Sequence, residues 1–303
     1  MGLRKNESLL IIYDENKAEI AKDFLKQSKK ISSKVKLMQI PVAKVNSQEP
    51  PEHAAKEMLK YGVIIMLTTK SLSHTLARKN ACERGARIAS MPNILKETLK
   101  RAILIDYDEL RKRTQRIKGI FEKGSFVRVT SNKGTDITMK IRKGALFTDT
   151  GIYKEKSEWG NIPGGEFAIS PLEGTAEGIF FVDASMAGVQ KLKNPIKVTV
   201  KKGFAVKIEG GREAEELKKL LEGLKDPNVY NIAELGIGTN DKAKVSGNIL
   251  EDEKVLGTAH IALGDNFSLK GNIRAATHLD GVFHKPTIYV DAKKIMENGR
   301  LLV

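Results

Sequence analysis

The sequence predicts an α/β plus α+β fold, with a small doubly wound domain at the N-terminus and a β-rich domain after it. In the first third of the chain, short apolar runs alternate with polar stretches of helical spacing, the pattern of strands and helices around a parallel sheet. After residue 125 the apolar positions recur in period two, which indicates antiparallel strands. The chain of 303 residues is therefore divided near residue 120, into an α/β domain over 1–120 and a β-rich domain over 121–303.

The N-terminal domain is expected to alternate strands and helices along its length. The segment 63–67 is entirely apolar, as a strand buried on both faces is, and the prolines before residue 52 suit the start of a helix. Gly85 follows the periodic segment 76–84 and marks its C-terminal end. In order, the expected elements are 9–13 (strand), 17–29 (helix), 35–40 (strand), 52–60 (helix), 63–67 (strand), 76–84 (helix), 86–89 (strand) and 92–118 (helical).

The C-terminal domain is expected to open with a β-hairpin. Residues 126–130 and 136–141 alternate apolar and polar side chains, and a turn-forming run, Ser-Asn-Lys-Gly, lies between them. Inward-facing leucines give residues 212–223 the apolar stripe of a helix. The other expected strands are 178–183, 196–200 and 205–209.

The formal charge of +15 lies entirely in the first half of the chain. Residues 1–150 hold 31 Lys and Arg against 16 Asp and Glu, whereas residues 151–303 hold 21 of each. A basic half can attract nucleic acid, but aromatic residues are only 6% of the chain and no zinc-finger or RNA-binding signature accompanies the charge. We therefore expect solvated lysines on helix surfaces and no nucleic-acid partner.

Cysteine usage and hydropathy predict a cytoplasmic protein with no membrane partner. The single cysteine, Cys82, cannot form an internal disulfide, which disfavours an oxidising compartment. The apolar runs are far shorter than the roughly 18–20 residues that a membrane span requires. The basic N-terminus reaches Asp14 and Glu15 too soon to contain a secretory core.

Three segments of the β-rich domain contain polar residues of the types that bind metal ions. Glu166 follows two glycines, and Glu234 stands in an apolar, glycine-rich run where an unpaired buried carboxylate would be costly. His278 and Asp280 are two residues apart, which on a strand places both on one face. Each of these residues also has a purely structural interpretation. The glutamates could be exposed carboxylates, and His260 could be a hydrogen-bonded imidazole in the core. His278 and Asp280 could stand two residues apart by chance.

Together these residues form a set of five possible ligands from scattered segments: Glu166, Glu234, His260, His278 and Asp280. Imidazole nitrogens and carboxylate oxygens suit Zn, Fe, Mn or Co. Scattered ligands are common in hydrolases with two metal ions, in which a carboxylate bridges ions about 3.5–4 Å apart and a shared water is the nucleophile. From residue types alone, a metal site and a purely structural set remain equally open.

The same segments resemble the thermophilic metallo-aminopeptidases of the aminopeptidase T and aminopeptidase S type. The matching motifs are 161–166 (NIPGGE), 233–238 (AELGIG), 249–264 (ILEDEKVLGTAHIALG) and 278–280 (HLD). The resemblance implies removal of N-terminal residues from peptides by a co-catalytic pair of divalent ions (Zn, Co or Mn) in a homodimer. It also implies that the five residues above are the ligands and that Glu166 accepts the proton of the attacking water.

One residue departs from the peptidase pattern. Seven residues after the first metal-binding histidine, that family has a tyrosine whose hydroxyl helps to stabilise the tetrahedral intermediate, and this chain has Phe267. Loss of one such donor commonly lowers the rate by roughly 10²–10³-fold. The chain is also shorter than the peptidases, so the walls that bind a peptide are expected to differ.

The chain is similar as well to the ring-cleaving dihydroxypyridine dioxygenases of the same superfamily, through the segment 71–75 and its compact length. This resemblance implies a mononuclear Fe(II) site formed by His260, His278 and Asp280, and a small-molecule substrate. Phe267 is easier to accept in such an enzyme, whereas Glu234 is better explained by a second metal. The peptidase is the principal expectation, the dioxygenase is the alternative, and a non-enzymatic role is the third hypothesis.

Overall fold

The computed structural model describes residues 1–303, apart from the side chain of Ser268. The chain folds into two compact units, Met1–Leu104 with Gly151–Gly164 and Ile105–Thr150 with Gly165–Val303. The first unit contains a parallel sheet and the second a large antiparallel one, which confirms the predicted fold class. The division differs from the expected single boundary at residue 120, because a later segment returns to the first unit to extend its sheet.

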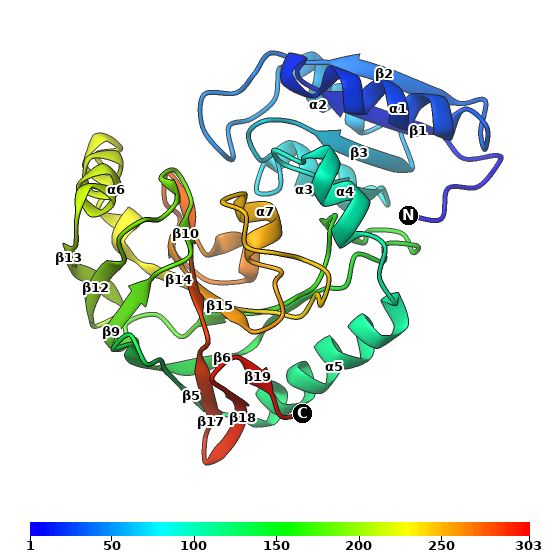
Figure 1. The fold of residues 1–303 in the computed structure, drawn as a ribbon. Helices are drawn as coiled ribbons and strands as arrows, with labels where there is room; N and C mark the ends of the chain where they lie inside the picture. The colour runs from blue at the N-terminus through cyan, green and yellow to red at the C-terminus, as the bar shows by residue number, and fades with distance from the viewer. The chain divides into compact units, whose positions relative to one another are not determined.

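Unit 1 is built on a five-stranded sheet in the order β2-β1-β3-β4-β7, and every pair in it is parallel. Figure 1 labels β1, β2 and β3 of this sheet. The order changes direction at β1, so right-handed crossovers place helices on both faces, as predicted for a doubly wound sheet. The fifth strand, β7, was not predicted from the sequence. The strands are β1 (Leu9–Tyr13), β2 (Val35–Gln39), β3 (Val63–Leu67), β4 (Arg87–Ser90) and β7 (Trp159–Asn161).

The helices of unit 1 cover the sheet through alternate residues of its strands. Leu10 and Ile12 of β1 belong to one core cluster with buried residues of α2 and α3, while α1 also packs against β1. The stretch 92–118, expected to be helical throughout, is interrupted before Asp106, whose carboxylate accepts the amide hydrogens of Asp108 and Glu109 in the first turn of α5. The elements are η1 (Glu15–Lys17), α1 (Ala18–Ser28), α2 (Glu52–Met58), α3 (Leu76–Glu83) and α4 (Lys96–Ala102).

Unit 2 contains a large sheet whose main path runs β11-β10-β16-β15-β14-β8-β6-β5-β17-β18-β19, with β9, β12 and β13 paired to its side. The predicted hairpin is confirmed as β5 and β6, although β6 continues past its expected end to pair with β8. The strands are β5 (Phe126–Thr130), β6 (Asp136–Asp149), β8 (Glu166–Pro171), β9 (Glu177–Val182), β10 (Ser185–Met186), β11 (Gln190–Lys191), β12 (Ile196–Lys201), β13 (Phe204–Glu209), β14 (Ile232–Gly238), β15 (Thr258–Gly264), β16 (His278–His284), β17 (Thr287–Val290), β18 (Lys293–Glu297) and β19 (Arg300–Leu301).

Two longer helices pack against the unit 2 strands. Phe121 of α5 contacts Phe167 of β8 with ring centroids 4.7 Å apart, and α6, whose bounds match the prediction, lies beside β12 and β13 (Figure 1). Among the described residues, none of the helices combines the length and the apolar character needed to cross a membrane. The elements are α5 (Tyr107–Lys123), α6 (Arg212–Gly223), η2 (Pro227–Tyr230), α7 (Ile249–Asp252) and η3 (Phe267–Leu269).

Gly119 in the interior of α5 tests the packing of this helix. A Cβ at Gly119 would have no atom within 4 Å, so Gly119→Ala should raise the free energy of unfolding by about 0.5–1 kcal/mol through helix propensity. At Gly124, just after the helix, a Cβ would lie 2.2 Å from Cγ1 of Val290, so Gly124→Ala should be destabilising. Urea unfolding of the two variants measures both effects, and a loss of stability in Gly119→Ala would contradict this packing.

Candidate metal centre

Four neighbouring strands of unit 2 present polar side chains on one face of the sheet. The strands are β8, β14, β15 and β16, paired antiparallel, and residues directly opposite one another in such pairs share a face. Glu234 lies opposite Ala262, which lies opposite Asp280, and Gly264 lies opposite His278. This face therefore brings together all five candidate residues: Glu166, Glu234, His260, His278 and Asp280.

The alternate residues of the same strands form the apolar core of the unit. Phe167 of β8 lies opposite Ile237 of β14, and Ala259 of β15 lies opposite Phe283 of β16; all four are buried in one cluster. Because the side-chain period of a strand is two, this packing fixes which face the polar residues occupy. A slip of one residue would move the carboxylates into the core.

Glycines in β14 leave room on the polar face. A Cβ on Gly236 would lie 2.1 Å from Cε1 and Nε2 of His260, and one on Gly238 would lie 2.1 Å from the carbonyl oxygen of Val255. The His260 ring therefore rests directly over the β14 backbone. After Glu234, the run thus alternates apolar side chains that face the core with Gly236, which makes space for the imidazole, and Gly238, which makes space for the Val255 carbonyl.

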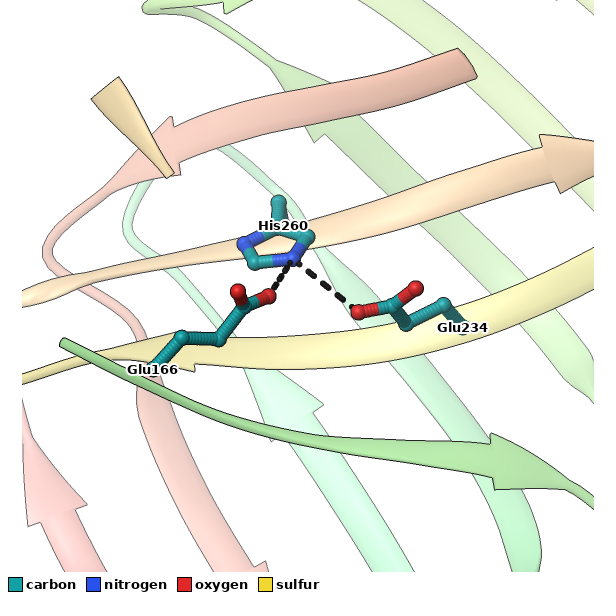
Figure 2. Close-up of side chains that lie close together, drawn as sticks. All are labelled: Glu166, Glu234 and His260. Carbon is teal, nitrogen blue, oxygen red and sulfur yellow. Dashed lines mark ion pairs between the residues drawn. The ribbon is translucent and has the colours of Figure 1, made fainter. Parts of the chain in front are cut away.

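His260 lies between two carboxylates (Figure 2). Its Nε2 is 2.8 Å from Oε1 of Glu166 and 3.5 Å from Oε1 of Glu234. The His260 residue is completely buried, and the two glutamates are 4% and 6% exposed. Glu253 and Asp280 also place a carboxylate oxygen within 4.8 Å of this imidazole.

His278 forms the second half of the cluster. Its Nε2 is 3.1 Å from Oε2 of Glu234 and 3.3 Å from Oδ1 of Asp280. Its Nδ1 is 2.6 Å from the carbonyl oxygen of Asp265, and an N–H at Nδ1 that donates to this oxygen leaves the lone pair of Nε2 facing the carboxylates. This is the tautomer that a metal-binding imidazole requires. Glu234 and Asp280 each lie within 4.8 Å of both imidazoles and so connect them.

The donor set fits a divalent metal ion. Nε2 of His260 lies at ion-pair distance from carboxylate oxygens but does not have hydrogen-bond geometry with them, and Nδ1 has no hydrogen-bond partner among the described side chains. Buried polar atoms are normally paired, and an unpaired one requires an explanation such as an ion. Two imidazoles with several carboxylates also form the nitrogen and oxygen environment that suits Fe, Mn, Co or Zn.

Sequence reasoning missed three further residues at this centre. Lys254 is 1% exposed and forms ion pairs with Glu166, with Glu253 at 2.9 Å and with Asp149 at 3.9 Å. Lys254 and Glu253 stand inside the motif 249–264, where a lysine beside acidic residues and next to an apolar run was the available signal. Asp149 has no such signal, because it reaches the centre only through the pairing of β6 with β8.

The charged groups of the centre shift one another's pKa values in opposite directions. Burial would raise the pKa of Glu166, but Lys254 and His260 outweigh it and lower that pKa to about 2. Burial raises the pKa of Glu253 to about 8, only partly opposed by Lys254. Burial would lower the pKa of His278, but the Asp280 and Glu234 carboxylates raise it well above its usual value. Divergent pKa values among buried neighbours are typical of functional sites.

Comparison with known proteins decides between the families suggested by the sequence. Residues 15–303 match the model of the NicX family, 2,5-dihydroxypyridine 5,6-dioxygenase. The chain belongs to this family. A 2,5-dihydroxypyridine 5,6-dioxygenase from Pseudomonas putida KT2440 is 24% identical over 250 residues, which cover 78% of this chain and 70% of that protein. Membership of the NicX family implies a metal cofactor.

Two solved structures share the fold of this chain. The 2,5-dihydroxypyridine dioxygenase from P. putida KT2440 has a TM-score of 0.85 at 20% identity, covering 99% of this chain and 93% of that chain. Wild-type AmpT from Thermus thermophilus has a TM-score of 0.72 at 15% identity, covering 99% of this chain and 95% of that chain. At these identities both similarities concern the fold.

The family match corrects the principal expectation from the sequence. The prediction of a hydrolase, a metallo-aminopeptidase, was wrong, because the chain matches the NicX dioxygenase family over almost its whole length. The resemblance to the peptidases is confirmed only as a similarity of fold. Phe267, unexpected in a peptidase, is 41% exposed and lies beneath the guanidinium group of Arg274, 3.8 Å from the ring centroid.

Proposed function

We propose that this protein is a ring-cleaving dioxygenase with a single Fe(II) ion, and that its substrate is a dihydroxylated pyridine. The observation that carries the proposal is the family match over residues 15–303. The name of the P. putida relative specifies 2,5-dihydroxypyridine as substrate and the bond between ring atoms 5 and 6 as the site of reaction. We expect the same class of substrate here, with both atoms of O₂ entering the ring-opened product.

The proposed ligands are His260, His278 and Asp280. Two histidines and one carboxylate are the donor set of non-haem Fe(II) oxygenases, which keep further positions of the ion open. A ferrous ion bound there would supply the one-electron chemistry that a closed-shell ring and O₂ lack by themselves. The backbone carbonyl of Asp265 orients His278 for this role, and Gly236 leaves room for the His260 ring over β14.

Glu234 is the proposed acceptor of a proton from a ring hydroxyl of the substrate. Burial would raise the pKa of Glu234, but His260 and His278 outweigh burial and lower it, so the carboxylate is ionised at neutral pH. Its two oxygens face the two imidazoles, at 3.5 Å and 3.1 Å. An ionised carboxylate between the two imidazoles is suited to general-base catalysis on a phenolic proton.

Oxygen uptake by the iron-loaded protein tests the proposal. The metal-free protein is loaded anaerobically with one equivalent of Fe(II) and mixed with 2,5-dihydroxypyridine in air-saturated buffer. We expect O₂ consumption equal to ring loss, and incorporation of two ¹⁸O atoms when ¹⁸O₂ is used. Zinc-loaded protein is the matched control, because zinc has no redox chemistry. Iron-loaded protein that consumes no O₂ with any dihydroxypyridine isomer would refute the proposed function.

A further inference from the structure

Lys254 is held rigidly in the turn that follows α7. Its amide donates to the carbonyl of Glu251 at 3.0 Å, and its own carbonyl accepts from the amide of Asn240 at 2.8 Å, just beyond β14. The next residue lies so close to Gly238 that a Cβ there would come within 2.1 Å of its carbonyl oxygen. The backbone of Lys254 is therefore fixed against the edge of the metal centre.

The side chain of Lys254 points into a group of buried carboxylates. Its Nζ bonds to Oε2 of Glu166, lies 2.9 Å from Oε1 of Glu253, and lies 3.9 Å from Oδ2 of Asp149. Lys254 and these three residues are all less than 9% exposed. A buried ammonium group is stable only with close acidic partners, and the Nζ of Lys254 faces three carboxyl groups here.

The two oxygens of Glu166 face different side chains. Oε1 lies 2.8 Å from Nε2 of His260, whereas Oε2 is bonded to the Lys254 ammonium. In a centre with two metal ions, a carboxylate commonly bridges the ions. Here the second oxygen of Glu166 is already paired with the Lys254 ammonium. The oxygens of Glu253 and Asp149 that face Lys254 are paired with the same ammonium.

We propose that Lys254 limits the centre to one divalent ion, because its ammonium group takes up one oxygen of Glu166 and the facing oxygens of Glu253 and Asp149, and so leaves a second ion fewer carboxylate donors. The fixed positive charge also repels a second divalent cation at short range in a buried site, where screening is weak. The inference rests on the proposed single-metal function and gives it a structural cause. It makes Lys254 a residue that sets metal stoichiometry, with no contact to the substrate required.

Cobalt binding tests the role of Lys254 without any measurement of activity. Metal-free protein is dialysed against excess Co²⁺, the bound cobalt per chain is measured by elemental analysis, and the visible cobalt absorption is recorded. We expect one cobalt ion in the wild type and two in Lys254→Met, with a second component in the absorption spectrum. Lys293→Met, the same change at an exposed lysine of β18, is the matched control and should bind one.

Stability and a second variant keep the test decisive. Lys254→Met leaves buried carboxylates without their cation, so its melting temperature should fall without metal and rise more steeply with Co²⁺ than that of the wild type. The double variant Lys254→Met with Glu166→Gln removes both members of the pair, so it should fold without metal and bind one cobalt ion.

Two results would overturn the inference: two tightly bound cobalt ions in the wild type, or one in a folded Lys254→Met. If Lys254→Met does not fold without metal, its cobalt is counted after refolding with excess Co²⁺, and one bound ion then overturns the inference as well. Because cobalt is counted without O₂ or substrate, these outcomes are distinct from a failure of the proposed function. Absence of O₂ uptake by the iron-loaded wild type, together with cobalt counts of one and two, would refute the dioxygenase and leave the role of Lys254 standing.

Discussion

Replacing His260 with alanine is expected to abolish iron retention and O₂ uptake. His260 is the only histidine of β15, and its Nε2 is the buried nitrogen that two carboxylates flank. Loss of a group that merely supports a ligand already lowers metal affinity or activity by roughly 10–100-fold, so loss of a ligand should cost more. Iron per chain after gel filtration and initial rates of O₂ uptake measure the two effects.

A matched histidine on the neighbouring strand controls for this prediction. His284 of β16 is exposed and lies at the far end of the strand from His278. His284→Ala should retain one iron per chain and the wild-type rate. If His260→Ala held iron as tightly as His284→Ala does, the imidazole of His260 would not be a ligand.

The second large effect is expected from a single methyl group at Gly236. In Gly236→Ala the new Cβ would lie 2.1 Å from two atoms of the His260 ring, a separation that no packing tolerates. The ring is the end of a side chain and can rotate away, so we expect a folded protein whose imidazole no longer faces Glu166 and Glu234. A misplaced ligand should lower metal affinity and O₂ uptake by about 100-fold or more.

Gly223→Ala is the matched control, because a Cβ at that end of α6 would have no atom within 4 Å. It should preserve stability, iron content and rate. Circular dichroism separates the two explanations for a defect in Gly236→Ala, since a native spectrum with lost iron indicates displacement of the ligand. An unchanged iron affinity in Gly236→Ala would show that the ring does not need its position over β14.

The local sequence predicted most of unit 1, and in unit 2 it predicted β5, β6, β9, β12 and β13 as strands but not how the strands of the large sheet pair. Each step from strand to helix between residues 9 and 89 is short, so the alternation is visible in the sequence. The strand β7 pairs with β4 across about 70 residues of intervening chain, a non-local contact that no local pattern reports. The pairing of β8, β14, β15 and β16 is equally non-local, and it decides which residues become neighbours.

The candidate site was predictable as a set of residue types and not as a function. Glycines beside carboxylates and histidines marked Glu166, Glu234, His260, His278 and Asp280, and the structure places all five together. Imidazoles and carboxylates suit both a two-metal hydrolase and a mononuclear iron oxygenase, so these residue types could not separate hydrolysis from oxidation. That decision came from the match to the NicX family along residues 15–303.

By itself, the sequence determined the fold class and the chemical identity of the groups at the centre, because periodicity and residue type are local properties. Only the tertiary structure decided that Lys254 and Asp149 belong to that centre, because strand pairing and the turn after α7 bring distant residues within ion-pair distance. Charges in a buried site act through space, so their effect depends on separations that the order of residues along the chain does not specify.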